Sequence, residues 1–272
     1  MAPELPLGKE VEYKDKYDPE LLYPISRQIA RKGLSISPPR PFYGFDIWNC
    51  YEVSWLNAKG KPEVRILEIT IPAISANIVE SKSLKLYLNS FNNTNFSNEA
   101  EVKELIKSDL SRILKSDIQL SLNSLEEYNH KPLSSFNGQS LDNYDIDFRH
   151  PNPLLKLASN ANKVSEILYS NLLRSNCPVT RQPDWASVQI SYSGLQLNHE
   201  ALLTYIVSFR NHNEFHEHCV ERMFCDIITV CNPEHLTVYA RYTRRGGIDI
   251  NPIRSTYDLK TTDLNNFRCV RQ

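Results

Sequence analysis

The stretch LKLYLNSFNNTN (Leu84–Asn95) recurs 118 residues further along the chain as LLTYIVSFRNHN (Leu202–Asn213). Six of the twelve aligned positions are identical, and they include a tyrosine, a serine and a phenylalanine at helical spacing. Self-similarity at a fixed offset is typical of a repeated supersecondary unit. We therefore predict two copies of one unit. Two similar helices within a single α+β domain would also produce such a match.

The elements predicted around the two stretches follow a common order. Aromatic and β-branched runs predict strands, and apolar residues three and four apart predict helices. In the first half we expect a β-hairpin, two helices and two strands, at residues 46–57 with 63–73, 83–92, 98–114, 117–125 and 143–148. In the second half we expect a strand, two helices and two strands, at residues 185–192, 200–209, 214–230, 235–243 and 248–253.

The predicted fold class is α+β, with two tandem β-β-α-α-β-β modules at residues 1–150 and 151–272. Helices inserted in an antiparallel strand set should cover one face of each sheet. Asn98 is the expected N-cap of the second helix of copy one. Residues 1 to about 45 form an extended lead-in, and residues 150–162 form a connection between the modules.

The composition argues against several classes of protein. The chain has 31 basic and 32 acidic residues, so it lacks the charge that would gather nucleic acid or an anionic membrane. The first residues do not resemble a signal peptide, and no apolar run is long enough to span a membrane. We expect a cytoplasmic protein whose six cysteines are thiols. Its eight glycines form neither Gly-x-Gly-x-x-Gly nor a Walker loop.

The copies differ in their polar residues. Before its first helix, copy one has Glu80, Ser81 and Lys82, where the 118-residue offset places Asn198, His199 and Glu200 in copy two. Copy two alone has a cysteine and an aspartate in the stretch SNCPVTRQPDW and the histidine-rich stretch HNEFHEHC. One site to which each copy contributes a part would explain this divergence.

Cys177 lies among turn-forming polar residues, which favours access to solvent over packing. It could be a nucleophile or a buried filler, since free cysteines are commonly buried. A nucleophilic thiol would need activation, because little thiolate exists at neutral pH. Asp184 could begin a strand, or it could act as a general acid if burial beside Trp185 raised its pKa.

Two further stretches have several interpretations. On a helix His212, His216 and Cys219 would share a face and could bind zinc. The same stretch could be a surface helix, or it could present a catalytic His216 and a ligand-binding Glu217. Glu217 and Glu80 would suit the donor edge of a guanine-like ring. The stretch RYTRRGGID could be a two-glycine turn, or its arginines and glycines could hold phosphates.

Together these residues resemble the NADPH-dependent 7-cyano-7-deazaguanine reductases of the queuosine pathway, in their long two-module form. The resemblance covers nearly the whole chain in order. It is carried by ESKSLKLYLNSF, SNCPVTRQPDWASVQI, SFRNHNEFHEHC and RYTRRGGIDI, together with the lead-in stretches YDPELLYPISRQ and GFDIWNCYEVSWLNAKGKP. It implies the tunnelling fold, with sites at module interfaces.

The resemblance also implies roles for particular residues. Cys177 would attack the nitrile carbon, Asp184 would protonate the nitrile nitrogen, and His216 would assist. The substrate would be held by Val79, Glu80, Ser81, His216 and Glu217. NADPH would be contacted by Ser81, Lys82, Arg245 and Gly246. The family implies no metal, and we expect a homodimer that binds a small deazapurine and no nucleic acid.

Two rival functions remain open at this point. One is a zinc-dependent purine or pterin hydrolase of the same fold, which would use His216 and Cys219. The other is a purine-binding module in which Cys177 is inert.

Overall fold

The computed structural model describes residues 13–34, 41–149, 154–159, 162–260 and 266–272. The chain divides into two compact units, and β2 and β10 each contribute residues to both. Unit 1 comprises Met1–Ala30, Ile47–Pro132 and Arg244–Ile250. Unit 2 comprises Arg31–Asp46, Leu133–Thr243 and Asn251–Gln272. Within the described residues no helix has the length and apolar character that a membrane crossing needs.

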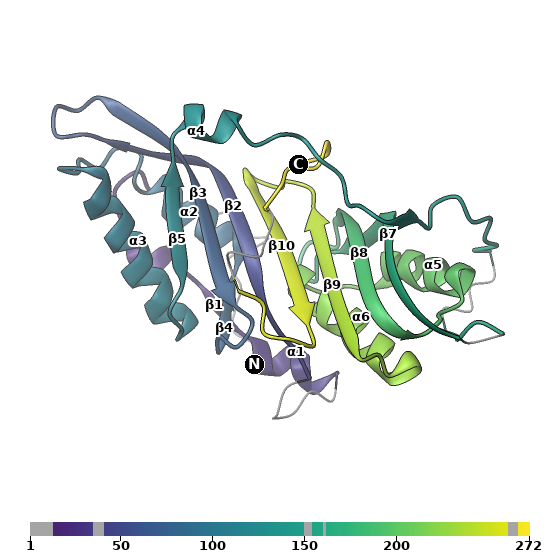
Figure 1. The fold of residues 1–272 in the computed structure, drawn as a ribbon. Helices are drawn as coiled ribbons and strands as arrows, with labels where there is room; N and C mark the ends of the chain where they lie inside the picture. Colours follow the sequence, from purple (N-terminus) through teal and green to yellow (C-terminus); the bar gives the residue numbers. More distant parts are fainter. Residues whose placement is uncertain (1–12, 35–40, 150–153, 160–161, 261–265) are drawn as a thin grey trace. The chain divides into compact units, whose positions relative to one another are not determined.

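Unit 1 contains the sheet and helices of copy one (Figure 1). Its strands are β1 (Pro24–Ser26), β2 (Tyr43–Leu56), β3 (Pro62–Pro72), β4 (Asn77–Val79) and β5 (Gln119–Asn123). Its helices are η1 (Pro19–Leu21), α2 (Ser81–Asn89), α3 (Glu99–Leu114) and α4 (Leu125–Asn129). Apolar side chains of α2 and α3 share one buried core with those of β2 and β3. The predicted hairpin and both helices are confirmed, and Asn98 caps α3.

Unit 2 contains the sheet and helices of copy two. Its strands are β6 (Gln139–Ser140), β7 (Lys163–Asn176), β8 (Pro183–Leu195), β9 (His235–Tyr242) and the second part of β10 (Ile248–Ser255). Its helices are α5 (His199–Ser208), η2 (Phe209–Asn211) and α6 (His216–Cys231), and α1 (Arg27–Lys32) ends in it. Strands β7 to β10 pair antiparallel, α5 packs on β7, and α6 packs on β9. The α+β class is confirmed.

Identical residues of the repeat make the same contacts in each unit. The Tyr87 hydroxyl donates to Asp109 at 2.7 Å, and the Tyr205 hydroxyl donates to Asp226 at 2.5 Å. Burial, reinforced by the aspartate, raises the pKa of both phenols, which therefore remain protonated donors. The next identical serine donates to the tyrosine carbonyl at 2.6 Å in both copies, and the identical phenylalanine packs edge-on against the tyrosine ring. These contacts confirm that the two stretches are structural equivalents.

Two predictions about strands are wrong. Residues 143–148 form no strand. The segment follows a turn, and the Tyr144 hydroxyl makes a hydrogen bond of 2.9 Å with Nδ1 of His199. Strand β7 was missed and begins directly after the predicted connection. Its inward and outward alternation breaks at a register shift between Ser170 and Leu173, so the period-two pattern of a strand is absent from its sequence.

A buried ion cluster joins three segments of unit 2. Glu221 of α6 accepts hydrogen bonds from Arg31 at 2.6 Å and from Arg254 at 2.8 Å. Arg254 also donates to Asp46 at 2.8 Å. Both guanidinium groups also lie over the ring of Phe42, that of Arg31 at 5.5 Å and that of Arg254 at 5.4 Å from its centre. The cluster fastens the described end of the lead-in to the helix that begins with His216.

Glu221→Ala should lower the free energy of unfolding by about 3–5 kcal/mol, because it leaves two buried guanidinium groups without their shared carboxylate. Urea unfolding followed by circular dichroism measures this change. The exposed Glu104→Ala on α3 is the matched control and should change stability little. A Glu221 variant as stable as this control would contradict the assignment.

Candidate active site

Cys177 opens the turn between β7 and β8. Its N–H donates to the Gln182 carbonyl at 2.8 Å, and its carbonyl accepts from the Arg181 N–H at 2.9 Å. Arg181 closes the turn with a φ of 58°. The prediction that Cys177 is accessible is wrong for the chain alone, since the residue is only 1% exposed. The antiparallel pairing that turns the chain here also directs Cys177 inward.

Asn176, the last residue of β7, fixes this turn against the loop before α6. Its N–H donates to the His212 carbonyl at 2.9 Å, and its carbonyl accepts from the Glu214 N–H at 3.2 Å. Its side-chain amide donates to the Arg210 carbonyl at 2.8 Å. Cys177 is therefore held close in space to the loop that leads into His216. No pattern in the sequence indicates this role, because each bond joins residues more than thirty positions apart.

Asp184 and His216 form a buried pair. His216 Nε2 lies 3.3 Å from Asp184 Oδ2, and the two residues are 7% and 6% exposed. Asp184 is the second residue of β8 and lies opposite Ser175 in the β7–β8 register. His216 is the first residue of α6, and its ring stacks on Tyr242 with centroids 3.7 Å apart. An acid and an imidazole in this arrangement can exchange a proton away from bulk water.

The other residues of the histidine-rich stretch are also placed by α6. Glu217 is 2% exposed, and His218 and Cys219 are buried, so the interpretation as a surface helix is wrong. His212 precedes α6 in an extended conformation, and the helical spacing expected for a zinc site is therefore not formed. Among the residues that the structure describes, no group of three or more potential ligands could hold a metal ion.

In unit 1 the segment Val79-Glu80-Ser81 joins β4 to α2. Both Glu80 carboxylate oxygens cap the helix, and they accept from the N–H groups of Lys82 at 2.9 Å and Ser83 at 2.7 Å. The Glu80 N–H donates to the Tyr23 carbonyl at 2.9 Å, and β1 pairs with β4 just before it. The described part of the lead-in thus shapes the segment expected to bind substrate.

Arg245 and Gly246 lie in a tight turn of unit 1. Arg245 and Ile248 exchange backbone hydrogen bonds of 2.8 and 3.2 Å around two glycines with φ of 61° and 76°. The two-glycine turn is therefore confirmed. A Cβ on Gly246 would lie 3.3 Å from Cδ of Lys85, which is one turn after Ser81 on α2. Unit 1 thus brings the Ser81 helix and the Arg245 turn together.

The predicted residues fall into two sets. Cys177, Asp184, His216 and Glu217 belong to unit 2, whereas Val79, Glu80, Ser81, Lys82, Arg245 and Gly246 belong to unit 1.

All six cysteines are free, as predicted, and several are poor nucleophiles. Burial raises the pKa of the Cys219 thiol to about 12 and those of Cys225 and Cys231 to about 11. Burial also raises the pKa of the Cys50 thiol. At neutral pH these four cysteines are protonated, so they should not compete for an electrophile.

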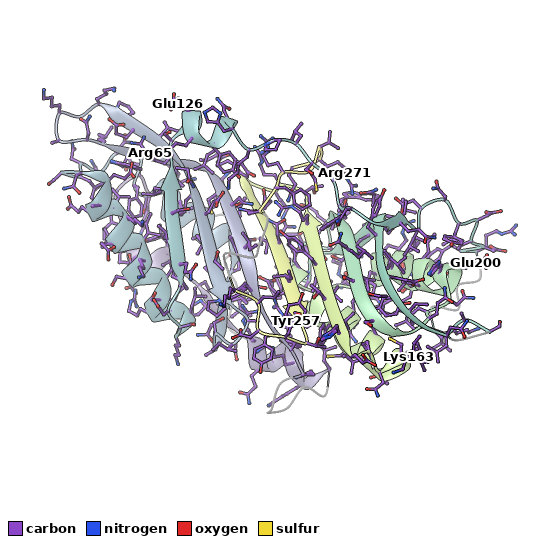
Figure 2. All side chains as sticks on the ribbon, viewed as in Figure 1. Arg65, Glu126, Lys163, Glu200, Tyr257 and Arg271 are labelled. Carbon is purple, nitrogen blue, oxygen red and sulfur yellow. The ribbon has the colours of Figure 1, made fainter. Side chains whose placement is uncertain are left out.

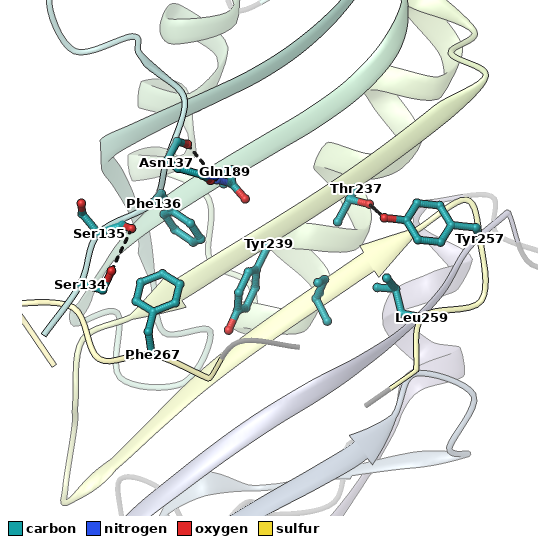
Figure 3. A pocket seen from close by; sticks show the side chains of 11 residues that line it. Ser134, Ser135, Phe136, Asn137, Gln189, Thr237, Tyr239, Tyr257, Leu259 and Phe267 are labelled. Carbon is teal, nitrogen blue, oxygen red and sulfur yellow. Dashed lines mark hydrogen bonds between the residues drawn. The ribbon is translucent and has the colours of Figure 1, made fainter. Parts of the chain in front are cut away.

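Unit 2 also has a pocket of about 460 Å³ that none of the predicted site residues lines. Its walls carry aromatic rings, including Phe136 and Tyr239, whose centroids are 5.4 Å apart (Figure 3). At its rim Gln189 donates to the Asn137 carbonyl at 2.9 Å. Its lining among the residues that the structure describes is aromatic, aliphatic and uncharged polar, unlike the acidic and imidazole groups of the site.

Comparison with known proteins supplies the family. Residues 13–122 match the family model described as nitrile reductase, 7-cyano-7-deazaguanine-reductase N-term, and residues 183–261 match the one described as QueF-like protein. A NADPH-dependent 7-cyano-7-deazaguanine reductase of Paraburkholderia phymatum is 51% identical over 276 residues, with 100% of each chain covered. This chain belongs to the family of NADPH-dependent 7-cyano-7-deazaguanine reductases.

Further reductases of this family match as well. One from Polaromonas sp. is 52% identical over 92% of each chain, and one from Desulfotalea psychrophila is 49% identical over 98% of this chain and 97% of its own. The solved apo structure of the archaeosine synthase QueF-Like is 16% identical, covers 38% of this chain and 99% of its own, and has a TM-score of 0.30. That structural likeness is too weak to bear on the fold.

Asn176→Ala should lower the free energy of unfolding by about 1 kcal/mol, because the partly buried bond to the Arg210 carbonyl is lost. Amide hydrogen exchange should become faster in residues 210–214. Mass spectrometry of proteolytic peptides measures the exchange rate and shows in which peptide it changes. The exposed Asn129→Ala is the control. Unchanged exchange in residues 210–214 would mean that Asn176 does not fasten this loop.

Proposed function

We propose that this chain reduces the nitrile of 7-cyano-7-deazaguanine to a primary amine with NADPH, as a step of queuosine biosynthesis. The observation that carries the proposal is the buried Asp184–His216 pair beside the turn that Cys177 opens. A nucleophile, an acid and an imidazole held by one hairpin and one helix terminus form an arrangement suited to covalent attack on an electrophilic carbon.

Cys177 would begin the reaction. Its sulfur forms a bond to the nitrile carbon, one π bond of the C≡N group breaks, and a proton reaches the nitrile nitrogen to give a thioimide. Asp184 would deliver that proton, with His216 beside it to restore the proton and to orient the substrate. The buried position of both residues keeps water from hydrolysing the thioimide. After the first hydride reaches this carbon, the C–S bond would break, which returns the thiolate and leaves an imine for the second hydride.

NADPH would supply two hydrides in succession, so one nitrile consumes two NADPH and two protons. The exposed Gly246 turn, beside the Arg245 side chain and close to Lys85, is open to a phosphate-bearing ligand and supplies cationic groups for it. We propose that Ser81, Lys82, Arg245 and Gly246 hold this cofactor. The amides of Lys82 and Ser83 already bind Glu80, so side chains would have to provide most of the phosphate contacts.

The deazapurine would be held by Val79, Glu80, Ser81, His216 and Glu217. Glu80 and Glu217 can accept from the N1–H and the exocyclic amine of a guanine-like ring. Glu80 already accepts one backbone N–H at each carboxylate oxygen, and each oxygen has a further lone pair for a ligand. The two bonds by which Glu80 caps α2 therefore also hold its carboxylate in one orientation.

We further propose that the two copies, at residues 1–150 and 151–272, are tunnelling-fold modules of a cytoplasmic homodimer. The repeated tyrosine–aspartate bond supports common ancestry of the modules. Gel filtration with light scattering tests the subunit count.

Incubation with 7-cyano-7-deazaguanine and without NADPH should add one substrate mass to the wild type and none to Cys177→Ala, because Cys177 is the proposed nucleophile. Intact-protein mass spectrometry measures the adduct. Cys225→Ala is the matched control and should form the adduct at the wild-type rate, since the raised pKa of about 11 keeps that thiol protonated.

The same variants should be assayed for NADPH oxidation, which should disappear in Cys177→Ala and persist in Cys225→Ala. A protein that binds the substrate but neither forms an adduct nor oxidises NADPH would be a purine-binding module. Adduct formation on Cys177→Ala would remove Cys177 from the proposed chemistry.

Lys82→Ala should raise the KM for NADPH about tenfold and leave the rate of adduct formation unchanged, because one charge-assisted bond to the cofactor is lost. Steady-state kinetics at varied NADPH measures the effect. Lys59→Ala, an exposed lysine in the β2–β3 turn of the same unit, is the control. Equal KM values for the two variants would exclude Lys82 from cofactor binding.

A further inference from the structure

The orientation of the His216 ring has one visible support besides Asp184. Phe215, the N-cap of α6, makes no side-chain hydrogen bond to the helix, and His216 is the first helical residue. Asp184 holds one ring nitrogen at 3.3 Å, and a single contact of that length leaves the ring free to rotate about it. The other nitrogen, Nδ1, is buried and has no hydrogen-bond partner among the described residues.

Tyr242 supplies the missing constraint. Its ring lies parallel to the imidazole, with an interplanar angle of 7° and a centroid separation of 3.7 Å. This stacking fixes the plane of the His216 ring, which the contact with Asp184 alone does not.

Tyr242 is itself held firmly in unit 2. It is the last residue of β9, it pairs with Ala186 of β8, and it is completely buried. Its carbonyl accepts from the Gln272 side-chain amide at 2.9 Å, and the next residue, Thr243, donates to the Trp185 carbonyl at 2.8 Å. Burial raises the pKa of its hydroxyl far above the neutral range, so the ring is an uncharged surface for the imidazole.

Copy one differs from copy two at the corresponding position. The segment after the first helix pairs in parallel with the end of the first strand at Leu56 and Asn95 in copy one, and at Asn176 and Asn213 in copy two. These bridges align Leu56 with Asn176, and therefore Trp55 with Ser175. Copy one thus has a large side chain at the position where copy two has a small one. Both are buried, so the smaller side chain leaves more room where β7 faces Asp184.

We infer that Tyr242 is a positioning residue for the proposed reduction: its ring holds the His216 imidazole so that one nitrogen faces Asp184 and the other is left for the substrate. This inference rests on the proposed function for its kinetic consequences. The placement of the ring can be tested without substrate, so a failure of the inference about Tyr242 can be distinguished from a failure of the proposed function.

The first experiment is an NMR measurement of the His216 ring protons in the full chain without substrate. His216→Gln identifies the signal among the seven histidines. Stacking on an aromatic ring shifts these protons upfield, and we expect Tyr242→Phe to retain the shift and Tyr242→Leu to lose it. Tyr239→Leu, on the same strand but packed against Phe136, is the matched control and should retain it. A shift that survives in Tyr242→Leu would overturn the inference.

The second experiment is a double-mutant cycle on turnover. Tyr242→Leu should lower kcat about 10²-fold with an unchanged KM for NADPH, whereas Tyr242→Phe should remain close to wild type. In the His216→Gln background Tyr242→Leu should have little further effect, because its action passes through His216. A full additional loss in that background would show a general structural role and overturn the inference. If Tyr242→Leu does not fold, Tyr242→Met replaces it with the same expectations.

If the wild-type protein does not oxidise NADPH in the presence of 7-cyano-7-deazaguanine, the proposed function is refuted. The NMR measurement then still tests the placement of the His216 ring.

Discussion

Two backbone hydrogen bonds at the end of β7 fix the geometry of the candidate site. Asn176 donates to the His212 carbonyl and accepts from the Glu214 N–H, so the chain between the two helices of copy two is tied to the strand that ends beside Cys177. Together with the contact between Asp184 and His216, this tie sets the distance between the cysteine and the first turn of α6. The bonds are made by main-chain atoms, so the position depends on the backbone and tolerates changes of neighbouring side chains.

The same tie exists in copy one, where Leu56 donates to the Thr94 carbonyl and accepts from the Phe96 N–H. The residue that follows Leu56 is Asn57, whose side chain accepts from two N–H groups of its own turn. The first residue of α3 is Glu99, which accepts from Arg65 (Figure 2) at 2.6 Å. The turn after the strand and the first residue of the second helix thus form one corner of the repeated unit. In copy one this corner has a turn held by Asn57 and an ion pair, and in copy two it has a thiol and an imidazole.

The sequence predicted the elements whose signals are local. The helices α2, α3 and α6 have apolar periodicity, α5 is a mostly apolar run of good helix length, and Asn98 is a cap of the expected type. The hairpin of β2 and β3 has a turn between two aromatic and β-branched runs. The missed strand β7 carries a register shift, which hides its alternation, and its partner β8 supplies most of its pairing. Such pairing between distant segments leaves no trace in either segment alone.

The candidate site shows the same division. Cys177, Asp184 and His216 were found through their residue types and through resemblance, because nucleophiles, acids and histidines are chemically distinctive. Their burial could not be predicted, since it depends on pairing of β7 with β8 and on bonds to a loop more than thirty residues away. Asn176 and Tyr242 escaped notice for a related reason. An asparagine and a tyrosine are ordinary residues until the fold places them against a catalytic candidate, and that placement depends on contacts across the sheet and the loop.

Because the unit is repeated, one copy can supply stability at a corner where the other copy supplies reactive groups. A buried acid beside an imidazole, with one ring nitrogen unpaired, costs free energy that a structural site would avoid. Unit 2 carries this cost together with a buried ion cluster around Glu221, which fastens the same helix to the lead-in and to β10. The corresponding part of copy one instead has the bonds of Asn57 within its turn and the ion pair of Arg65 with Glu99. A repeated fold can therefore keep one corner for stability and adapt the other for reactivity, with the same backbone holding both.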